Sequence, residues 1–170
     1  KIDTAFLNEY SKELEKEGDA LTIARIGEWI AQSRFVDGAV VIALDGVMDA
    51  KGELDKAATE IYVDDDFVAD NVKKYPGLYF GASVNPLRKD ALERLAKAKE
   101  KGAVLIKWLP AVQGFDPADS KFDAFYQKLI ELNLPLLSHV GDEDSFTVTN
   151  NALSVPQKLK RALDIGVKII

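Results

Sequence analysis

Short apolar runs alternate with longer amphipathic segments along most of the chain. Apolar runs rich in aliphatic residues predict five buried strands, at 38–44, 77–86, 103–110, 134–140 and 166–170. Between them, apolar positions at helical spacing predict helices at 21–33, 87–101, 121–132 and 156–165, and a further helix capped by Asp64, Asp65 and Asp66 that ends before Pro76. One strand and one helix per roughly 30 residues is typical of a parallel sheet.

These units place the chain in the α/β class, as parallel (β/α) units from the central portion of a TIM-type (β/α)8 barrel. Helical sequence begins near Lys1, and Ile170 ends inside a predicted strand. Eight such units need about 250 residues. We therefore expect residues 1–170 to be a single domain, an incomplete TIM barrel with about strands 2 to 6, rather than a complete five-stranded doubly wound sheet.

Composition narrows the classes of partner. The net charge is −6, whereas nucleic-acid-binding domains usually carry a basic face. The chain has no cysteine, which excludes disulfides, thiolate metal sites and a cysteine nucleophile. Its apolar runs are far shorter than the ~20 residues that a membrane span requires. We expect a cytoplasmic protein that acts on a small molecule without nucleic acid or membrane partners, and a homo-oligomer is compatible with this.

Polar residues close four of the predicted strands. They are Asp45, Asn85, Lys107 with its neighbour Trp108, and His139, the only histidine. In parallel βα folds the functional face lies at the carboxyl ends of the strands. We therefore expect Asp45, Asn85 and Trp108 to bind substrate and Lys107 to act in catalysis.

Two of these residues allow alternative interpretations on local sequence alone. Lys107 interrupts an apolar strand, so it binds an anionic substrate group, is carbamylated to bridge metals, or points into solvent. His139 is either a metal ligand or a structural residue that finishes a buried strand. The acids Asp142, Glu143 and Asp144 either orient His139 or form an exposed acidic loop tip.

A succession of motifs between Tyr75 and Gly141 is more specific than any single residue. It reads YPGLYFGASVNP, then GAVLIKWLPAVQGFDP, then LPLLSHVG. In this order the motifs resemble the amidohydrolase-related family of metal-dependent TIM-barrel hydrolases. The resemblance implies that Lys107 lies on the fourth barrel strand and His139 on the fifth, where His139 is a ligand of a divalent metal, commonly zinc.

The resemblance also implies a reaction. The family's metal activates a water for attack on a carbonyl or a ring C–N or C–O bond, or supports decarboxylation. The hypothesis is a metal-dependent hydrolase or related lyase that acts on a small anionic substrate. The family's histidine pair on the first strand, the histidine after the sixth and the aspartate of the eighth have no counterpart here. We therefore expect these 170 residues to be the middle section of a longer enzyme and inactive alone. The alternative is a non-catalytic α/β domain that binds a small anion.

Overall fold

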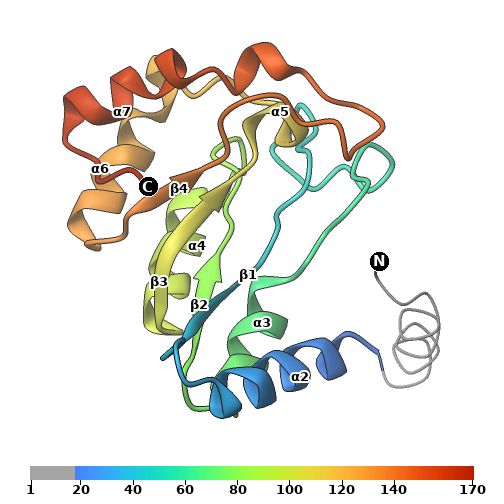
Figure 1. Ribbon diagram of the computed structural model, residues 1–170. Helices are drawn as coiled ribbons and strands as arrows, with labels where there is room; N and C mark the ends of the chain where they lie inside the picture. The colour runs from blue at the N-terminus through green and yellow to red at the C-terminus, as the bar shows by residue number, and fades with distance from the viewer. Residues whose placement is uncertain (1–17) are drawn as a thin grey trace.

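The computed structural model describes residues 18–170. Within these residues the first element is helix α2 (Asp19–Gln32), after which strands and helices alternate (Figure 1). The strands are β1 (Ala39–Ile42), β2 (Leu78–Ala82), β3 (Ala103–Trp108) and β4 (Leu136–Ser138). The other α-helices are α3 (Asp65–Val72), α4 (Ala91–Glu100), α5 (Pro110–Gln113), α6 (Asp123–Glu131) and α7 (Lys160–Ile165), with 3-10 turns at Ser120–Phe122, Asn151–Leu153 and Pro156–Leu159.

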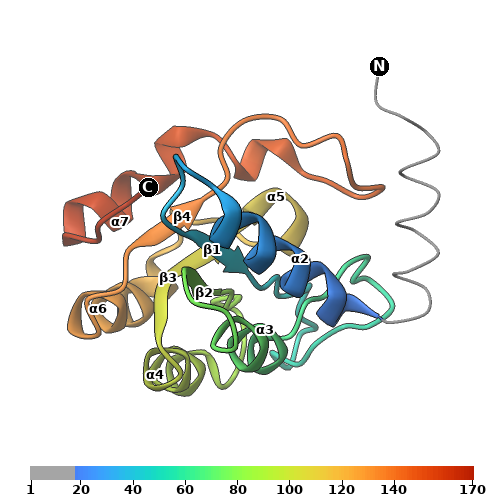
Figure 2. The same cartoon turned by 60° about the horizontal axis from the view of Figure 1, so that its bottom comes forward.

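The four strands form one parallel sheet in the order β1-β2-β3-β4. The sheet curls into a half-barrel, with α3, α4 and α6 along its outer side (Figure 2). This confirms the predicted α/β class and the partial TIM-barrel architecture. The further prediction that these are strands 2 to 6 of a larger barrel stays a prediction, and the helical sequence expected near Lys1 lies outside the described residues.

Local sequence signals set several element boundaries as predicted. Asp64 caps α3, because its Oδ1 accepts a hydrogen bond from the backbone N–H of Phe67 at 3.0 Å. Gly166 ends α7 with a φ of 108°, a left-handed conformation that glycine adopts without a Cβ clash. One element was not predicted: the segment after Pro110, expected as a loop, begins with the short helix α5. Pro110 favours this helix because it fixes φ at the first helical position.

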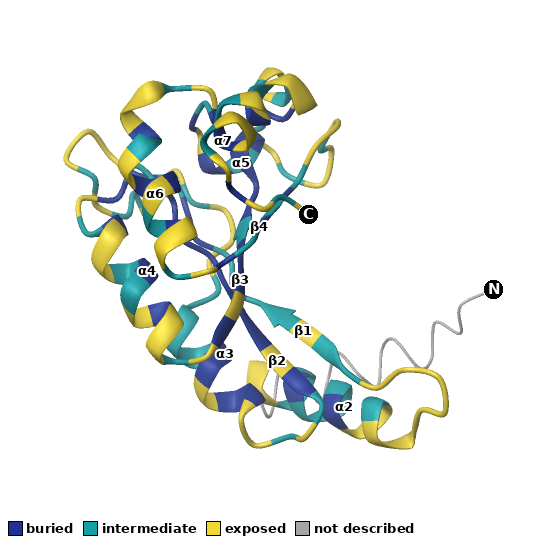
Figure 3. Cartoon of the chain, turned by 90° about the vertical axis from the view of Figure 1, so that its left-hand side faces the viewer, coloured by how far each residue is buried: buried dark blue, intermediate teal, exposed yellow. Residues whose placement is uncertain are grey.

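The hydrophobic core lies between the sheet and the outer helices. Phe80, Ile106 and Trp108 point toward this side and are buried with Leu95 and Leu129 of the flanking helices. Strands β2 and β3 are accordingly buried along much of their length (Figure 3). Because successive residues of a strand face opposite sides, the alternate positions form a second face.

This second face, here called the inner face, contains Val40, Ile42, Gly81, Leu105 and Lys107. A Cβ on Gly81 would lie 3.0 Å from Val40 and 3.1 Å from Leu105, so glycine lets side chains of β1 and β3 approach each other across β2. The inner face is partly open at the start of the strands, where Val40 is 38% exposed.

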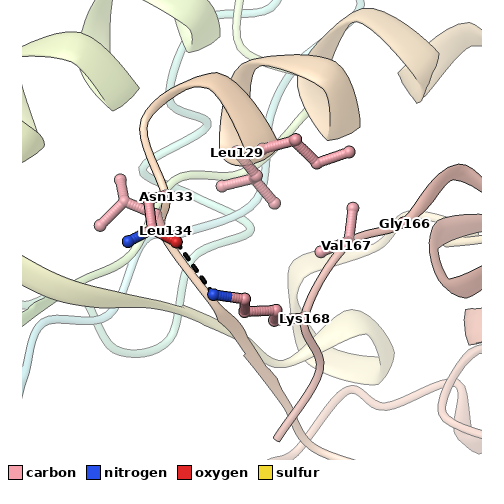
Figure 4. Close-up of a pocket in the computed structure, with 7 residues that line it drawn as sticks. Leu129, Asn133, Leu134, Gly166, Val167 and Lys168 are labelled. Carbon is pink, nitrogen blue, oxygen red and sulfur yellow. Dashed lines mark hydrogen bonds between the residues drawn. The ribbon is translucent and has the colours of Figure 1, made fainter.

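The predicted fifth strand at 166–170 is present only as a short extended segment beside β4. Ile169 forms a single parallel bridge with Leu136, and the Ile170 N–H donates to the Leu136 carbonyl at 2.9 Å. A small hollow lies where this segment leaves α7, lined by Leu129, Ile130, Asn133, Leu134, Gly166, Val167 and Lys168 (Figure 4). It adjoins the start of β4, whereas the strand-end polar residues lie at the opposite end, so it is separate from the site described next.

Candidate active site

Lys107 and His139 lie on the same face of neighbouring strands. Lys107 pairs in register with Leu137, and paired residues of a parallel sheet point to the same side. His139 follows Leu137 by two positions, and its backbone N–H continues the sheet by donating to the Trp108 carbonyl at 2.9 Å. The two predicted residues therefore meet at the carboxyl ends of β3 and β4, on the inner face.

Lys107 is half-buried, and burial lowers the pKa of its ammonium group because the charged form loses hydration. The negative charge of Glu143 acts in the opposite direction and favours the charged form. No salt bridge joins Lys107 to a charged group of residues 18–170, Glu143 included. A lysine in this state keeps its donors free for an anionic group that reaches the inner face at the carboxyl ends of the strands, here called the mouth of the half-barrel.

His139 has Glu143 as its nearest charged neighbour. The His139 Nε2 atom is 4.0 Å from Glu143 Oε2, and Nε2 is buried with no hydrogen-bond partner among the described residues. The His139 side chain as a whole is 29% exposed, so this exposure comes from side-chain atoms other than Nε2. The imidazole thus turns Nε2 toward the protein interior.

Glu143 is fixed at the base of the loop that follows β4. Its Oε1 accepts from the Ser145 N–H at 2.7 Å, and its own N–H donates to Asn151 Oδ1 at 3.0 Å. The hydrogen bond from Ser145 is the main cause that lowers the pKa of the Glu143 carboxyl, which therefore stays ionised at neutral pH. Glu143 thus places a fixed negative charge near both Lys107 and His139.

Asp45, at the end of β1, forms a buried ion pair. Its carboxylate accepts from Arg88 Nε at 2.6 Å and from Arg88 Nη2 at 2.7 Å, and both side chains are at most 6% exposed. Two backbone N–H groups, of Gly46 and Asn85, complete the set of donors at 2.9 and 2.8 Å. All of these donors belong to the protein, so Asp45 has a structural explanation, and its predicted role in substrate binding remains untested.

Asn85 and Gln113 continue this buried network. The Asn85 amide donates to the carbonyls of Gly46 and Gln113, both at 2.9 Å, while its oxygen accepts from the Leu87 N–H at 3.0 Å. The Gln113 side chain accepts from the Leu109 N–H at 2.7 Å and donates to the Asp45 carbonyl at 3.1 Å. Asn85 is fully buried, and its substrate-binding role stays a prediction.

Ser83 connects the network to Lys107. The Ser83 hydroxyl donates to the Lys107 carbonyl at 2.9 Å and accepts from the Asp45 N–H at 3.0 Å. Its backbone N–H donates to Asp65 Oδ1 at 2.9 Å. The carboxyl ends of β1, β2 and β3 are thereby tied together beneath the mouth.

Trp108 points away from Lys107, into the core between the sheet and the outer helices. It is fully buried, and its Nε1–H donates to the Val84 carbonyl at 2.7 Å. Its ring packs against Phe115, Phe125 and Tyr126 at centroid distances of 4.7, 5.1 and 5.9 Å. Its predicted contact with substrate is not tested by these observations, which assign it a packing role.

Several network residues could not be identified from sequence. Arg88 lies at the polar start of the predicted helix 87–101 and Gln113 in the segment after Pro110, and neither place signals burial, which follows from the meeting of three strand ends. Asp65 stands out in the sequence as part of the acidic triplet 64–66, but that triplet was predicted only to cap a helix. The structure adds that burial raises the pKa of Asp65 to about 7, with Asp45 and Asp64 raising it further and the Ser83 N–H and Arg94 opposing.

His139 and Glu143 suit a divalent cation in kind, since imidazole nitrogen and carboxylate oxygen are both zinc ligands. They do not suffice in number. A catalytic zinc site takes three protein ligands, and residues 18–170 contain no group of three or more such side chains. The described residues therefore contribute at most part of a metal site.

Comparison with known families decides the class of the protein. Residues 31–164 match the sequence model of a family described as amidohydrolase. The chain belongs to the amidohydrolase family. The match spans all four strands, β1 to β4, and contains both Lys107 and His139. A search among curated proteins gives no match.

Membership of the amidohydrolase family places the protein in a family of hydrolases. Amidohydrolases generally use divalent metals. The predicted family resemblance, which rested on the motifs between Tyr75 and Gly141, is thus confirmed. Within residues 18–170, no helix is both long and apolar enough to cross a lipid bilayer.

Proposed function

We propose that the protein is a metal-dependent hydrolase, or a related lyase, that acts on a small anionic substrate at the mouth of the half-barrel. The observation that carries this proposal is the meeting of Lys107 and His139 on the inner face, at the carboxyl ends of neighbouring strands. The carboxyl ends of barrel strands are where the catalytic residues of TIM-barrel enzymes lie. Family membership supports the hydrolytic chemistry.

The two residues have different roles in this proposal. The Lys107 ammonium binds and orients the anionic group of the substrate, for which its partial burial and free donors suit it. His139 is a ligand of the divalent metal, and zinc is the metal we favour. When bound, zinc supplies Lewis acidity to a substrate oxygen and lowers the pKa of a coordinated water to about 7. The remaining ligands lie outside the set that residues 18–170 bring together.

A second function is favoured by one observation, the absence of a complete ligand set among the described residues. In this alternative the protein binds a small anion through Lys107 without catalysis. We propose in either case a cytoplasmic location and a small-molecule partner. Metal content separates the two functions, because only the enzyme needs bound metal.

The experiment is metal analysis of the natural full-length protein and of its His139→Ala variant. We expect about one zinc per chain in the wild type and a loss by orders of magnitude in the variant, together with loss of hydrolysis across a panel of small carboxylate esters, lactones and amides. Circular dichroism should show a retained fold. Thr147→Ala, in the loop after β4, is the matched control and should keep its metal. Wild-type protein without metal, or a variant with unchanged metal, would overturn the proposal.

A further inference from the structure

The buried Nε2 atom of His139 needs a hydrogen-bond partner. This atom is buried and has no hydrogen-bond partner among residues 18–170, although the side chain is 29% exposed. Leaving a buried polar atom unpaired costs about 1–3 kcal/mol. A hydrogen bond between Nε2 and a nearby donor or acceptor would remove this cost, and one charged group lies near Nε2.

That group is the carboxylate of Glu143, whose Oε2 is 4.0 Å from Nε2. The Glu143 side chain is only 14% exposed, and its other oxygen, Oε1, is already engaged by the Ser145 N–H at 2.7 Å. Oε2 is thus the oxygen turned toward the imidazole. A carboxylate oxygen only accepts hydrogen bonds, so a proton on Nε2 makes this approach favourable and a lone pair there makes it repulsive.

The loop around Glu143 holds this arrangement in place. The Glu143 N–H donates to Asn151 Oδ1 at 3.0 Å, and the Gly141 N–H donates to the Ser154 carbonyl at 2.9 Å. Both bonds join the start of the loop to its far end. A hydrogen bond between Oε2 and Nε2 requires this 4.0 Å separation to shorten, with the loop backbone held by these two bonds.

We propose that Glu143 is a positioning residue for His139: its Oε2 accepts a hydrogen bond from Nε2–H, which fixes the ring and leaves Nδ1 as the nitrogen with the free lone pair. The inference rests on the proposed function, because in that function a metal or substrate contacts the free nitrogen, Nδ1. It extends the proposed function by naming Nδ1 as the contacting nitrogen and Glu143 as the residue that keeps the proton on Nε2. A second N–H held by a carboxylate is a common way to orient a ligating imidazole.

Neighbouring acids provide the matched controls. Asp142 and Asp144 are exposed and make no ion pair with His139, although they carry the same charge in the same loop. Asp144→Asn and Glu143→Gln remove the same charge, but only the second changes the residue beside Nε2. Glu143→Gln keeps the length of the side chain, but its single oxygen stays with the Ser145 N–H and its NH2 group then faces Nε2–H, so this variant loses the acceptor as Glu143→Ala does.

The experiment uses the fact that His139 is the only histidine. Labelling histidine with 15N gives one imidazole to observe by NMR, and the spectrum is recorded at alkaline pH so that the ring is neutral. We expect the wild type to show the Nε2–H tautomer with a protected ring proton. In Glu143→Ala that proton should exchange with water on the order of tenfold faster, the effect of one lost hydrogen bond. Glu143→Gln should lose the protection as Glu143→Ala does, whereas Asp144→Asn should keep all of it.

Two results would overturn the proposal: an Nδ1–H tautomer in the wild type, or unchanged proton exchange in Glu143→Ala. The NMR readout does not depend on catalysis, so it is separate from the proposed function. Zinc titration of the full-length protein tests the connection between the two, and Glu143→Ala should weaken zinc about 10–100-fold. If the ring depends on Glu143 but the wild type binds no zinc, the positioning role stands and the metal-dependent function fails.

Discussion

The Asp45 carboxylate and the Arg88 guanidinium meet through two hydrogen bonds, of 2.6 and 2.7 Å, in a position where neither side chain is more than 6% exposed. The pair joins the end of β1 to the segment before α4. Two backbone N–H groups satisfy the carboxylate further. This geometry offsets the cost of removing both charges from water, and it makes the loss of either partner expensive.

Removal of the Arg88 charge should therefore destabilise the fold strongly. We expect Arg88→Met to lower the free energy of unfolding by about 3–5 kcal/mol, because Asp45 is then left buried and unpaired. The measurement is urea denaturation followed by circular dichroism. Lys89→Met breaks the neighbouring exposed pair with Glu53, 63% and 56% exposed, and should cost at most about 1 kcal/mol. Equal effects of the two variants would contradict the structural role of the buried pair.

The parts of the fold that were predictable are those with a local signal. The alternation of apolar strands with amphipathic helices gave the α/β class and the four parallel strands, and Asp64 and Gly166 marked helix ends. The helix after Pro110 was missed because four residues are too few to show periodicity. At 166–170 the pattern was right, but pairing is limited to one bridge with Leu136.

The candidate site was predictable only in part, since its residues come together through long-range packing. The strand-end rule placed Lys107 and His139 at one edge, and the structure puts them on one face. The same rule could not distinguish a side chain that points inward from one that points outward. Trp108 follows Lys107 directly and for that reason faces the core. Arg88 could not be anticipated as the partner of Asp45, because the two are 43 positions apart.

Asp65 should make stability depend on pH between about 5 and 8. Burial raises its pKa to about 7, above the ordinary value of 3.8, so the folded state keeps a proton that the unfolded state has already lost. The free energy of unfolding then falls as pH rises through this window and levels off above about pH 8. Aspartates of lowered pKa, such as Asp66, titrate below this range and do not contribute to the slope.

The test is Asp65→Asn, whose amide oxygen can still accept from the Ser83 N–H. We expect the variant to lose the slope between pH 5 and 8 and to gain on the order of 1–3 kcal/mol over wild type at pH 8, as urea denaturation would measure. Asp66→Asn is the control, since that carboxylate is paired on the surface with Lys97. A wild-type profile that rises with pH in this window would refute the assignment.

Trp108→Phe distinguishes packing from substrate contact. The change leaves the Val84 carbonyl without its 2.7 Å donor and opens space beside Phe115, so we expect a loss of about 2–4 kcal/mol in the free energy of unfolding. The affinity for a bound ligand should change little. Trp29→Phe, at a position 56% exposed, serves as the control and should be nearly neutral. Normal stability with weakened ligand binding would instead support the contact that the sequence predicted.

Lys107→Met should separate binding from folding most cleanly. The substitution keeps the length of the side chain but removes a charge whose pKa burial lowers, so the folded state is relieved of a desolvated ammonium group. We expect the free energy of unfolding at pH 7 to stay equal or to rise slightly, by up to about 1 kcal/mol.

The same variant should bind a small anion, such as acetate or inorganic phosphate, about tenfold or more weakly, because one charge-assisted contact is lost. Calorimetry measures this binding. Lys168→Met, at the opposite end of the strands and paired with Asn133, should leave that binding unchanged. A collapse of stability in Lys107→Met, with anion binding intact in the folded fraction, would assign the lysine to the fold instead of the site.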